Sequence, residues 1–191
     1  MSIYRNVVWF TKGMSEYTKQ GYESAAKSFR AADLDVNLAD RSIMITGANS
    51  GIGKICALEV AKRGATVHMV CRSEERGTAA QKEIIDTSKN NNVFLHICDI
   101  SQPRNVMKFA KDFVESKKPL NILMNNAGCM INDRQTVEDD LEANFATNTL
   151  GTFILTKTLL PVIEQGDKPR VVSNLKLFFK KKKNKFSITF L

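Results

Sequence analysis

The chain has 191 residues, of which 43% are hydrophobic and 25% are charged, as is typical of one ordinary globular domain. The net charge of +8 is concentrated: six lysines lie in residues 174–191, which leaves +2 for the rest and argues against a nucleic-acid partner. Four separated cysteines and two isolated histidines offer no set of zinc ligands. We therefore expect no bound metal and reduced thiols in an intracellular, cytoplasmic protein.

Residues 1–40 are expected to form an N-terminal helical extension. Over residues 3–30, apolar side chains recur at spacings of four and three along one face, namely Ile3, Val7, Phe10, Met14 and Tyr17. Such a helix either packs on the following domain or lies on a membrane surface. The charges on its other face are mixed, which favours packing and leaves membrane association as the alternative. The four-residue apolar run Val7 to Phe10 is too short for a secretory signal or a membrane span.

Strands and helices alternate in residues 41–173. The pattern predicts strands at 42–46, 66–71, 93–98, 120–124 and from 170 onward, separated by helices at 51–63, 73–88, 103–116 and 137–164. This alternation is typical of βαβ units, and so of an α/β fold with a doubly wound parallel sheet. His68 and His96 fall inside predicted strands, where we expect packed or half-buried imidazoles rather than catalytic groups.

Residues 174–191 differ in composition from the rest of the chain. Sixteen of the 18 residues are Lys, Asn, Phe, Ile or Leu, and the change occurs within the fifth predicted strand. We interpret this aberrant basic and aromatic tail as the product of a splice variant or an incomplete gene model. The alternative is a tail that touches anionic lipid.

A glycine-rich loop joins the first predicted strand to the next helix. It reads T-G-x3-G-x-G and contains Thr46, Gly47, Asn49, Ser50, Gly51, Ile52 and Gly53. The first glycine permits a tight turn, the second lets a diphosphate approach the backbone, and the third lets the helix pack on the strand. The helix N-terminus then presents free N–H groups to phosphate. The loop therefore predicts a dinucleotide site.

Three further motifs follow in the same order as in a known family. Asp99-Ile100 follows the third strand, Asn125-Asn126-Ala127-Gly128 follows the fourth, and Asn148-Thr149-Leu150-Gly151 lies in the long helical stretch. Together with the glycine-rich loop, they resemble the short-chain dehydrogenase/reductase family.

This resemblance implies a Rossmann-like sheet of five strands, in the order 3-2-1-4-5, within a nucleotide-binding domain over residues 41–173. It further implies that Asp99 and Ile100 lie near the adenine of the cofactor, and that Asn126, Ala127 and Gly128 line the cofactor site. Asn148 would be the asparagine of the family's catalytic tetrad.

The end of the second predicted strand favours NADP over NAD. An acidic residue at this corner would hold the ribose 2′-hydroxyl of NAD, whereas the chain has Arg72, 19 residues after Gly53. A guanidinium can pair with a 2′-phosphate through charge-assisted hydrogen bonds. NADP is therefore the expected cofactor.

The rest of the family's catalytic tetrad has no counterpart in these 191 residues. The resemblance implies reduction of carbonyl compounds or oxidation of alcohols, with a tyrosine as general acid/base, a lysine four residues later and a serine at the carbonyl. Tyr4, Tyr17 and Tyr22 all precede the glycine-rich loop, and Ser173 comes too early to be the catalytic serine.

We therefore expect a longer form to act on a small-molecule carbonyl or alcohol substrate, and this chain to be an inactive monomer. The alternative is a non-catalytic fragment that binds a nucleotide or a partner.

Overall fold

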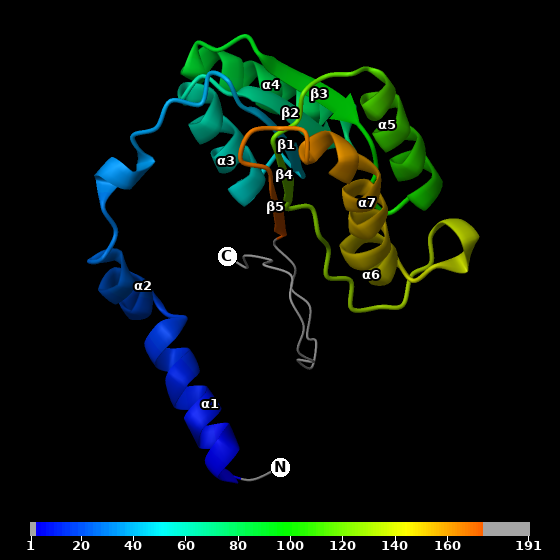
Figure 1. Ribbon diagram of the computed structural model, residues 1–191. Coiled ribbons are helices and arrows are strands. Elements are labelled where there is room, and N and C mark those ends of the chain that lie inside the picture. Colours follow the sequence, from blue (N-terminus) through cyan, green and yellow to red (C-terminus); the bar gives the residue numbers. More distant parts are fainter. Residues whose placement is uncertain (1–2, 174–191) are drawn as a thin grey trace. The chain divides into compact units, whose positions relative to one another are not determined.

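The computed structural model describes residues 3–173 and divides the chain into two compact units (Figure 1). The first unit ends at Val36 and the second begins at Asn37. The tail predicted at 174–191 lies outside the described residues. None of the helices in residues 3–173 is long and apolar enough to cross a membrane.

The first unit contains two helices, α1 (Ile3–Glu16) and α2 (Lys19–Ala26), followed by a 3-10 turn at Ala31–Leu34. The single continuous helix predicted over 3–30 is therefore wrong. Thr18 causes the break: its backbone is extended, and its hydroxyl donates to the Met14 carbonyl at 2.9 Å and accepts from the Gly21 N–H at 3.4 Å. One side chain thus ends α1 and caps α2.

The second unit is a parallel sheet with helices on both faces, as predicted. Its strands are β1 (Ser42–Thr46), β2 (Thr66–Cys71), β3 (Val93–Ile97), β4 (Ile122–Asn125) and β5 (Arg170–Ser173), in the order β3-β2-β1-β4-β5. The helices that connect them are α3 (Gly51–Lys62), α4 (Glu74–Ser88), α5 (Pro103–Glu115) and α7 (Thr152–Ile163) (Figure 1). The expected Rossmann-like strand order is confirmed, and the strand and helix ends lie within two residues of the predictions outside the 137–164 stretch.

Each face of the sheet has its own hydrophobic core. Ile43 and Ile45 of β1 lie in the core beneath α3 and α4, whereas Met44 lies in the core beneath α5 and α7. This division follows from the alternation of side chains along a strand. Because both faces are covered, all five residues of β1 are buried, and the glycine-rich loop that follows it is attached to a fixed centre.

The helix predicted over 137–164 is wrong in its first half. The structure has a 3-10 turn at Glu138–Asp140, a short helix α6 (Ala143–Phe145), a π-helical turn at Ala146–Gly151 and then α7. Leu141 is extended, which breaks the helix. Gly151 lies so close to the loop after β3 that a Cβ atom there would be 2.0 Å from the Ile100 carbonyl oxygen. This contact between distant segments positions the π-helical turn.

The two histidines form a pair on the α5 side of the sheet. His68 Nδ1 lies 3.0 Å from His96 Nε2, and the His68 ring stacks on Phe94 and meets Phe113 edge-on. Burial lowers the pKa of His68 to about 4, with smaller contributions from His96 and Lys118. Burial also lowers the pKa of His96. Both imidazoles are therefore neutral packing groups near pH 7, in keeping with the prediction.

Candidate functional site

A cleft of about 420 Å³ opens at the carboxyl ends of the central strands. It lies where β1 has β2 on one side and β4 on the other, the position at which doubly wound sheets bind ligands. Nine of the predicted cofactor residues line it: Gly47, Asn49, Ser50, Arg72, Asp99, Ile100, Asn126, Ala127 and Gly128. Thr46, Gly51, Ile52, Gly53 and Asn148 do not belong to this lining.

The glycine-rich loop brings Ser50, the residue that precedes α3, to the cleft. Gly47 and Gly51 have φ values of +67° and +53°, in a region that residues with a Cβ rarely adopt. Ser50 precedes the helix without capping it through its side chain. The first-turn N–H groups therefore have no side-chain acceptor from Ser50, and with the helix dipole they form a cradle suited to a diphosphate.

Gly53 allows α3 to begin directly against the loop that follows β4. A Cβ atom at this position would lie 2.5 Å from both Asn126 Nδ2 and the Gly47 carbonyl oxygen. The Asn126 amide meanwhile donates to the Thr46 carbonyl at 3.0 Å. The third glycine of the motif thus makes room for a hydrogen bond between β1 and the β4 loop.

Thr46 supports the cleft from behind. Its side chain is buried, and its hydroxyl oxygen accepts hydrogen bonds from the backbone N–H groups of Asn126 at 3.0 Å and Ala127 at 2.9 Å. These two bonds join the end of β1 to the start of the loop after β4. The threonine predicted as a cofactor residue therefore holds two lining segments together.

Asp99 and Ile100 form the wall of the cleft beyond β3. The Asp99 carboxylate accepts from the Ser101 N–H at 2.9 Å and from its hydroxyl at 2.8 Å, which fixes the turn into α5. Ile100 is almost fully buried. Burial raises the pKa of the neighbouring Cys98 thiol to about 11, with the Asp99 charge adding to the effect. Cys98 is therefore a neutral lining group and not a nucleophile.

Asn148 lies within the π-helical turn, and both polar atoms of its amide hold a loop. Its oxygen accepts from the Cys129 N–H at 2.9 Å, and its nitrogen donates to the Cys129 carbonyl at 2.8 Å. Gly128 precedes this clamp, and a Cβ there would lie 3.2 Å from the Asn148 oxygen. The side chain of Asn148 thus orients the loop that borders the cleft.

Sequence reasoning missed several lining residues. The cleft is also bordered by Val70, Arg76, Cys98, Ser101, Cys129, Ile131, Gln135, Val137, Ala143 and Thr147. Most belong to the irregular segment after β4, for which periodicity gives no signal. Arg76 had a signal, since it is a second arginine four residues after Arg72, in the first turn of the next helix. The described residues contain no cluster of three or more His, Cys, Asp or Glu side chains able to hold a metal ion.

Comparison with known proteins agrees with this geometry. Residues 41–174 match the family model described as short chain dehydrogenase. The chain is 55% identical over 173 residues to dehydrogenase/reductase SDR family member 12 of Homo sapiens, covering 91% of this chain and 54% of that protein. It is 40% identical over 139 residues to retinol dehydrogenase 12 of Bos taurus, covering 73% of this chain and 44% of that protein. The chain thus spans about half the length of the curated relatives it matches.

Two solved structures with bound cofactor are also similar. A short chain dehydrogenase of Shigella flexneri in complex with NADP superposes with a TM-score of 0.61 at 28% identity, over 71% of this chain and 59% of that one. A short chain dehydrogenase of Escherichia coli in complex with NADPH superposes with a TM-score of 0.62 at 26% identity. This similarity covers 73% of this chain and 60% of that one. Both similarities extend over most of the present chain.

Proposed function

The chain belongs to the short chain dehydrogenase family, and from this premise we propose that residues 41–173 form an NADP(H)-binding domain. The observation that carries the proposal is the open N-terminus of α3 at the cleft, with Gly51 at positive φ and Gly53 packed against Asn126. Both features suit a dinucleotide diphosphate. NADP in one similar structure and NADPH in another support the same cofactor.

The lining residues divide the cleft into regions suited to parts of the cofactor. Asn49 and Ser50, which directly precede α3, would hold the diphosphate, while Asp99 and Ile100 would border the adenine. Asn126, Ala127 and Gly128 would lie along the remainder of the dinucleotide, with Thr46 holding their loop. The cofactor supplies a hydride, and the protein supplies the binding and orientation.

We further propose that a longer form of this protein carries out NADP(H)-dependent oxidoreduction of a small carbonyl or alcohol compound. Within the 191 residues, no tyrosine follows Tyr22, so the general acid/base of the family has no counterpart in residues 37–191. Asn148 is the tetrad member that remains, and it positions the loop at Cys129. The 191-residue polypeptide is accordingly a cofactor-binding unit without catalysis. The second candidate role, a non-catalytic partner-binding fragment, shares this cofactor site.

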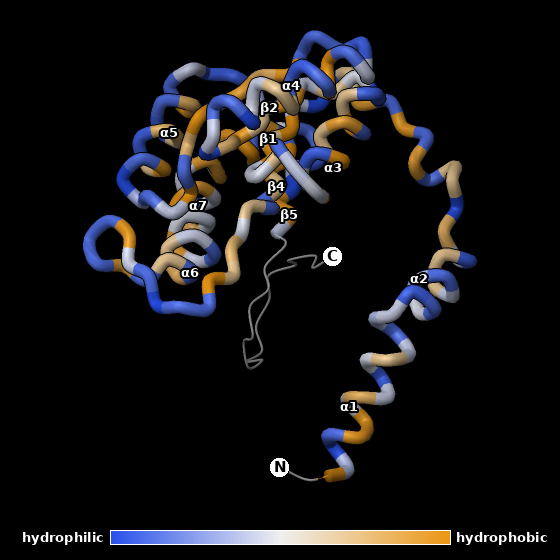
Figure 2. The backbone as a smooth tube through the Cα atoms, turned by 180° about the vertical axis from the view of Figure 1, so that it is seen from behind, coloured by the Kyte–Doolittle hydropathy of each residue, from blue (hydrophilic) through white to orange (hydrophobic). Residues whose placement is uncertain are grey.

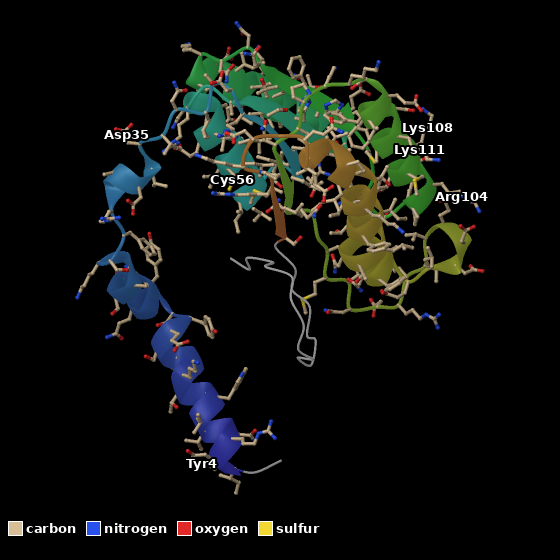
Figure 3. The ribbon with its side chains drawn as sticks, in the orientation of Figure 1. Tyr4, Asp35, Cys56, Arg104, Lys108 and Lys111 are labelled. Atoms are coloured by element: carbon tan, nitrogen blue, oxygen red, sulfur yellow. The ribbon has the colours of Figure 1, made fainter. Side chains whose placement is uncertain are left out.

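Replacing Arg72 with aspartate is expected to reverse the cofactor preference. The wild type should bind NADPH more tightly than NADH, and Arg72→Asp should weaken NADPH binding by roughly 10- to 100-fold, the worth of one charge-assisted hydrogen bond. Calorimetric titration with both cofactors measures this. Lys111→Asp is the matched control, because Lys111 lies on α5 outside the cleft lining (Figure 3). Equal affinity of the wild type for both cofactors would contradict the role of Arg72.

For the first unit we propose contact with a membrane surface through α1. This helix buries none of its side chains, and Ile3, Val7, Phe10 and Met14 are exposed at spacings of four and three. Figure 2 shows apolar and polar positions interleaved along it. The charged residues of the helix, Arg5, Lys12 and Glu16, lie away from this stripe, and Lys12 pairs with Glu16 at 3.8 Å.

Co-sedimentation with vesicles of phosphatidylcholine and phosphatidylserine tests the role of α1. The wild type should sediment with the vesicles, and Phe10→Glu should remain in the supernatant, because a carboxylate in the apolar stripe opposes insertion. Ser15→Glu is the control, since it adds the same charge outside the stripe. Retention of vesicle binding by Phe10→Glu would argue that the helix instead packs on protein.

A further inference from the structure

Two arginines border the cleft at the end of β2. Arg72 directly follows the strand, and Arg76 lies in the first turn of α4, one helical turn further along the chain. Both guanidinium-bearing residues line the same cleft as the glycine-rich loop. The two side chains therefore approach one ligand site from two different elements.

The packing of α4 places Arg76 beside the end of β2. Gly77 is buried, and a Cβ atom there would lie 2.8 Å from Leu95 Cδ1 and 3.4 Å from Cys71 Cβ. The absence of that side chain lets the first turn of α4 rest directly on β2 and β3. Ser73 fixes the start of the helix, since its hydroxyl oxygen accepts from the Arg76 N–H at 3.4 Å. The backbone of Arg76 is thus anchored next to the cofactor corner.

The charge of Arg76 affects the thiol of Cys71, the last residue of β2. Burial raises the pKa of the Cys71 thiol, and this rise is opposed by hydrogen bonds from the backbone of Ala48 and Asn49 and then by the charge of Arg76. Ala48 and Asn49 belong to the glycine-rich loop. Cys71, at the end of β2, is therefore close to both the glycine-rich loop and the Arg76 guanidinium.

Neither arginine at the rim has a carboxylate partner in the part of the chain that the structure describes. Arg30, Arg41 and Arg104 each form an ion pair with an aspartate, whereas the ion pairs within residues 3–173 include neither Arg72 nor Arg76. Two like charges that face one cleft repel each other, and an anion bound between them removes that repulsion. The rim therefore favours an anionic ligand.

We propose that Arg76 is a second binding residue for the ribose 2′-phosphate of NADP(H), acting together with Arg72. The inference rests on the proposed function, because it concerns the same cofactor site. A phosphate monoester carries between one and two negative charges near neutral pH and offers three acceptor oxygens, enough for two guanidinium groups. Arg72 reaches it from the strand end and Arg76 from the helix.

Separate binding sites for the diphosphate and the 2′-phosphate allow NADP(H) to be distinguished from NAD(H). The diphosphate, common to NADP(H) and NAD(H), belongs at the N-terminus of α3, whereas the 2′-phosphate is present in NADP(H) alone. A residue that reads the 2′-phosphate affects one cofactor and not the other. A residue that merely stabilises the fold affects both.

The test is equilibrium binding of NADPH and NADH, followed by cofactor fluorescence, for the wild type, Arg76→Gln, Arg76→Lys and Lys82→Gln. Arg76→Gln should weaken NADPH binding about tenfold or more and leave NADH binding within about twofold. Arg76→Lys should restore part of the loss, because it keeps the charge but not the bidentate geometry. Lys82→Gln removes the same charge from an exposed position of α4 outside the cleft lining and should change neither affinity.

A second probe isolates the phosphate. Adenosine 2′,5′-bisphosphate should compete for the site better than ADP in the wild type, and this advantage should shrink in Arg76→Gln. If the wild type prefers NADPH and Arg76→Gln leaves that preference intact, Arg76 has no part in reading the phosphate. Equal losses for both cofactors would make Arg76 a structural residue. If the wild type binds neither dinucleotide, the proposed function itself fails. The other outcomes concern Arg76 alone and leave the proposed function in place.

Discussion

The 191-residue polypeptide is expected to bind NADPH without reducing carbonyl compounds. A positioned general acid/base contributes about 10²- to 10⁴-fold to such a reaction, and residues 37–191 contain no tyrosine to supply it. In the family, a lysine four residues after the tyrosine lowers the pKa of that tyrosine. Without the tyrosine, such a lysine would have no group to act on. NADPH oxidation, followed by absorbance with a panel of aldehydes, ketones and quinones, should therefore remain at the background rate.

Two comparisons make this result informative. A longer form that carries a serine and a Y-x-x-x-K segment should turn over the same substrates while keeping the same cleft. Gly51→Asp should abolish NADPH binding in both forms, because it places a carboxylate and a Cβ at a position of positive φ beside the diphosphate. Saturable turnover by the 191-residue polypeptide that is lost in Gly51→Asp would contradict the prediction. It would show that these residues contain a complete active site.

Acidification is expected to destabilise the second unit through the buried histidine pair. The pKa of His68 is about 4 in the folded chain, against an ordinary value of 6.5. The unfolded state therefore takes up a proton first as the pH falls. Stability is complete above pH 6.5 and decreases toward pH 4, by roughly 3 kcal/mol for a pKa difference of this size. Burial also lowers the pKa of His96, so it acts in the same direction.

Denaturant titrations at pH 7 and pH 4.5 measure this loss. The double variant His68→Phe, His96→Phe removes both titrating groups while keeping aromatic rings among Phe94, Phe109 and Phe113, so its stability should change less over the same interval. Lys118, whose charge contributes to both lowered pKa values, is retained in this variant. An identical pH dependence in wild type and double variant would assign the acid sensitivity to other groups.

The regular part of the fold could be predicted because its signals are local. Apolar strands such as 42–46 and 66–71, separated by helices with glycine or proline at their ends, mark each unit of the sheet. The motifs after the first, third and fourth strands contain eight of the lining residues and Arg72 after the second strand is the ninth; they meet at one cleft, since the carboxyl ends of parallel strands lie at one edge.

Two of the remaining features depend on contacts between distant segments. The π-helical turn before α7 is positioned where Gly151 meets the Ile100 carbonyl, a contact that no periodicity announces. The hydroxyl of Thr46 accepts a hydrogen bond from a loop 80 residues away, a role that its position in the motif did not indicate. The break at Thr18 is local, and the apolar spacing did not reveal it because that spacing runs up to Tyr17, the residue directly before it.

The bonds between Thr46 and the β4 loop have a consequence for the order in which the protein is made. Thr46 is synthesised 80 residues before Asn126, and Ile43 pairs with Ile122 across a similar interval. A nascent chain that has completed β1, α3 and β2 therefore has the glycine-rich loop, but it still lacks the loop after β4 that Thr46 contacts. Such non-local parallel pairing forms slowly. The proposed dinucleotide would not act at this early stage. It would add stability only once β4 has docked, by about 2.7 kcal/mol at a hundredfold excess over its Kd.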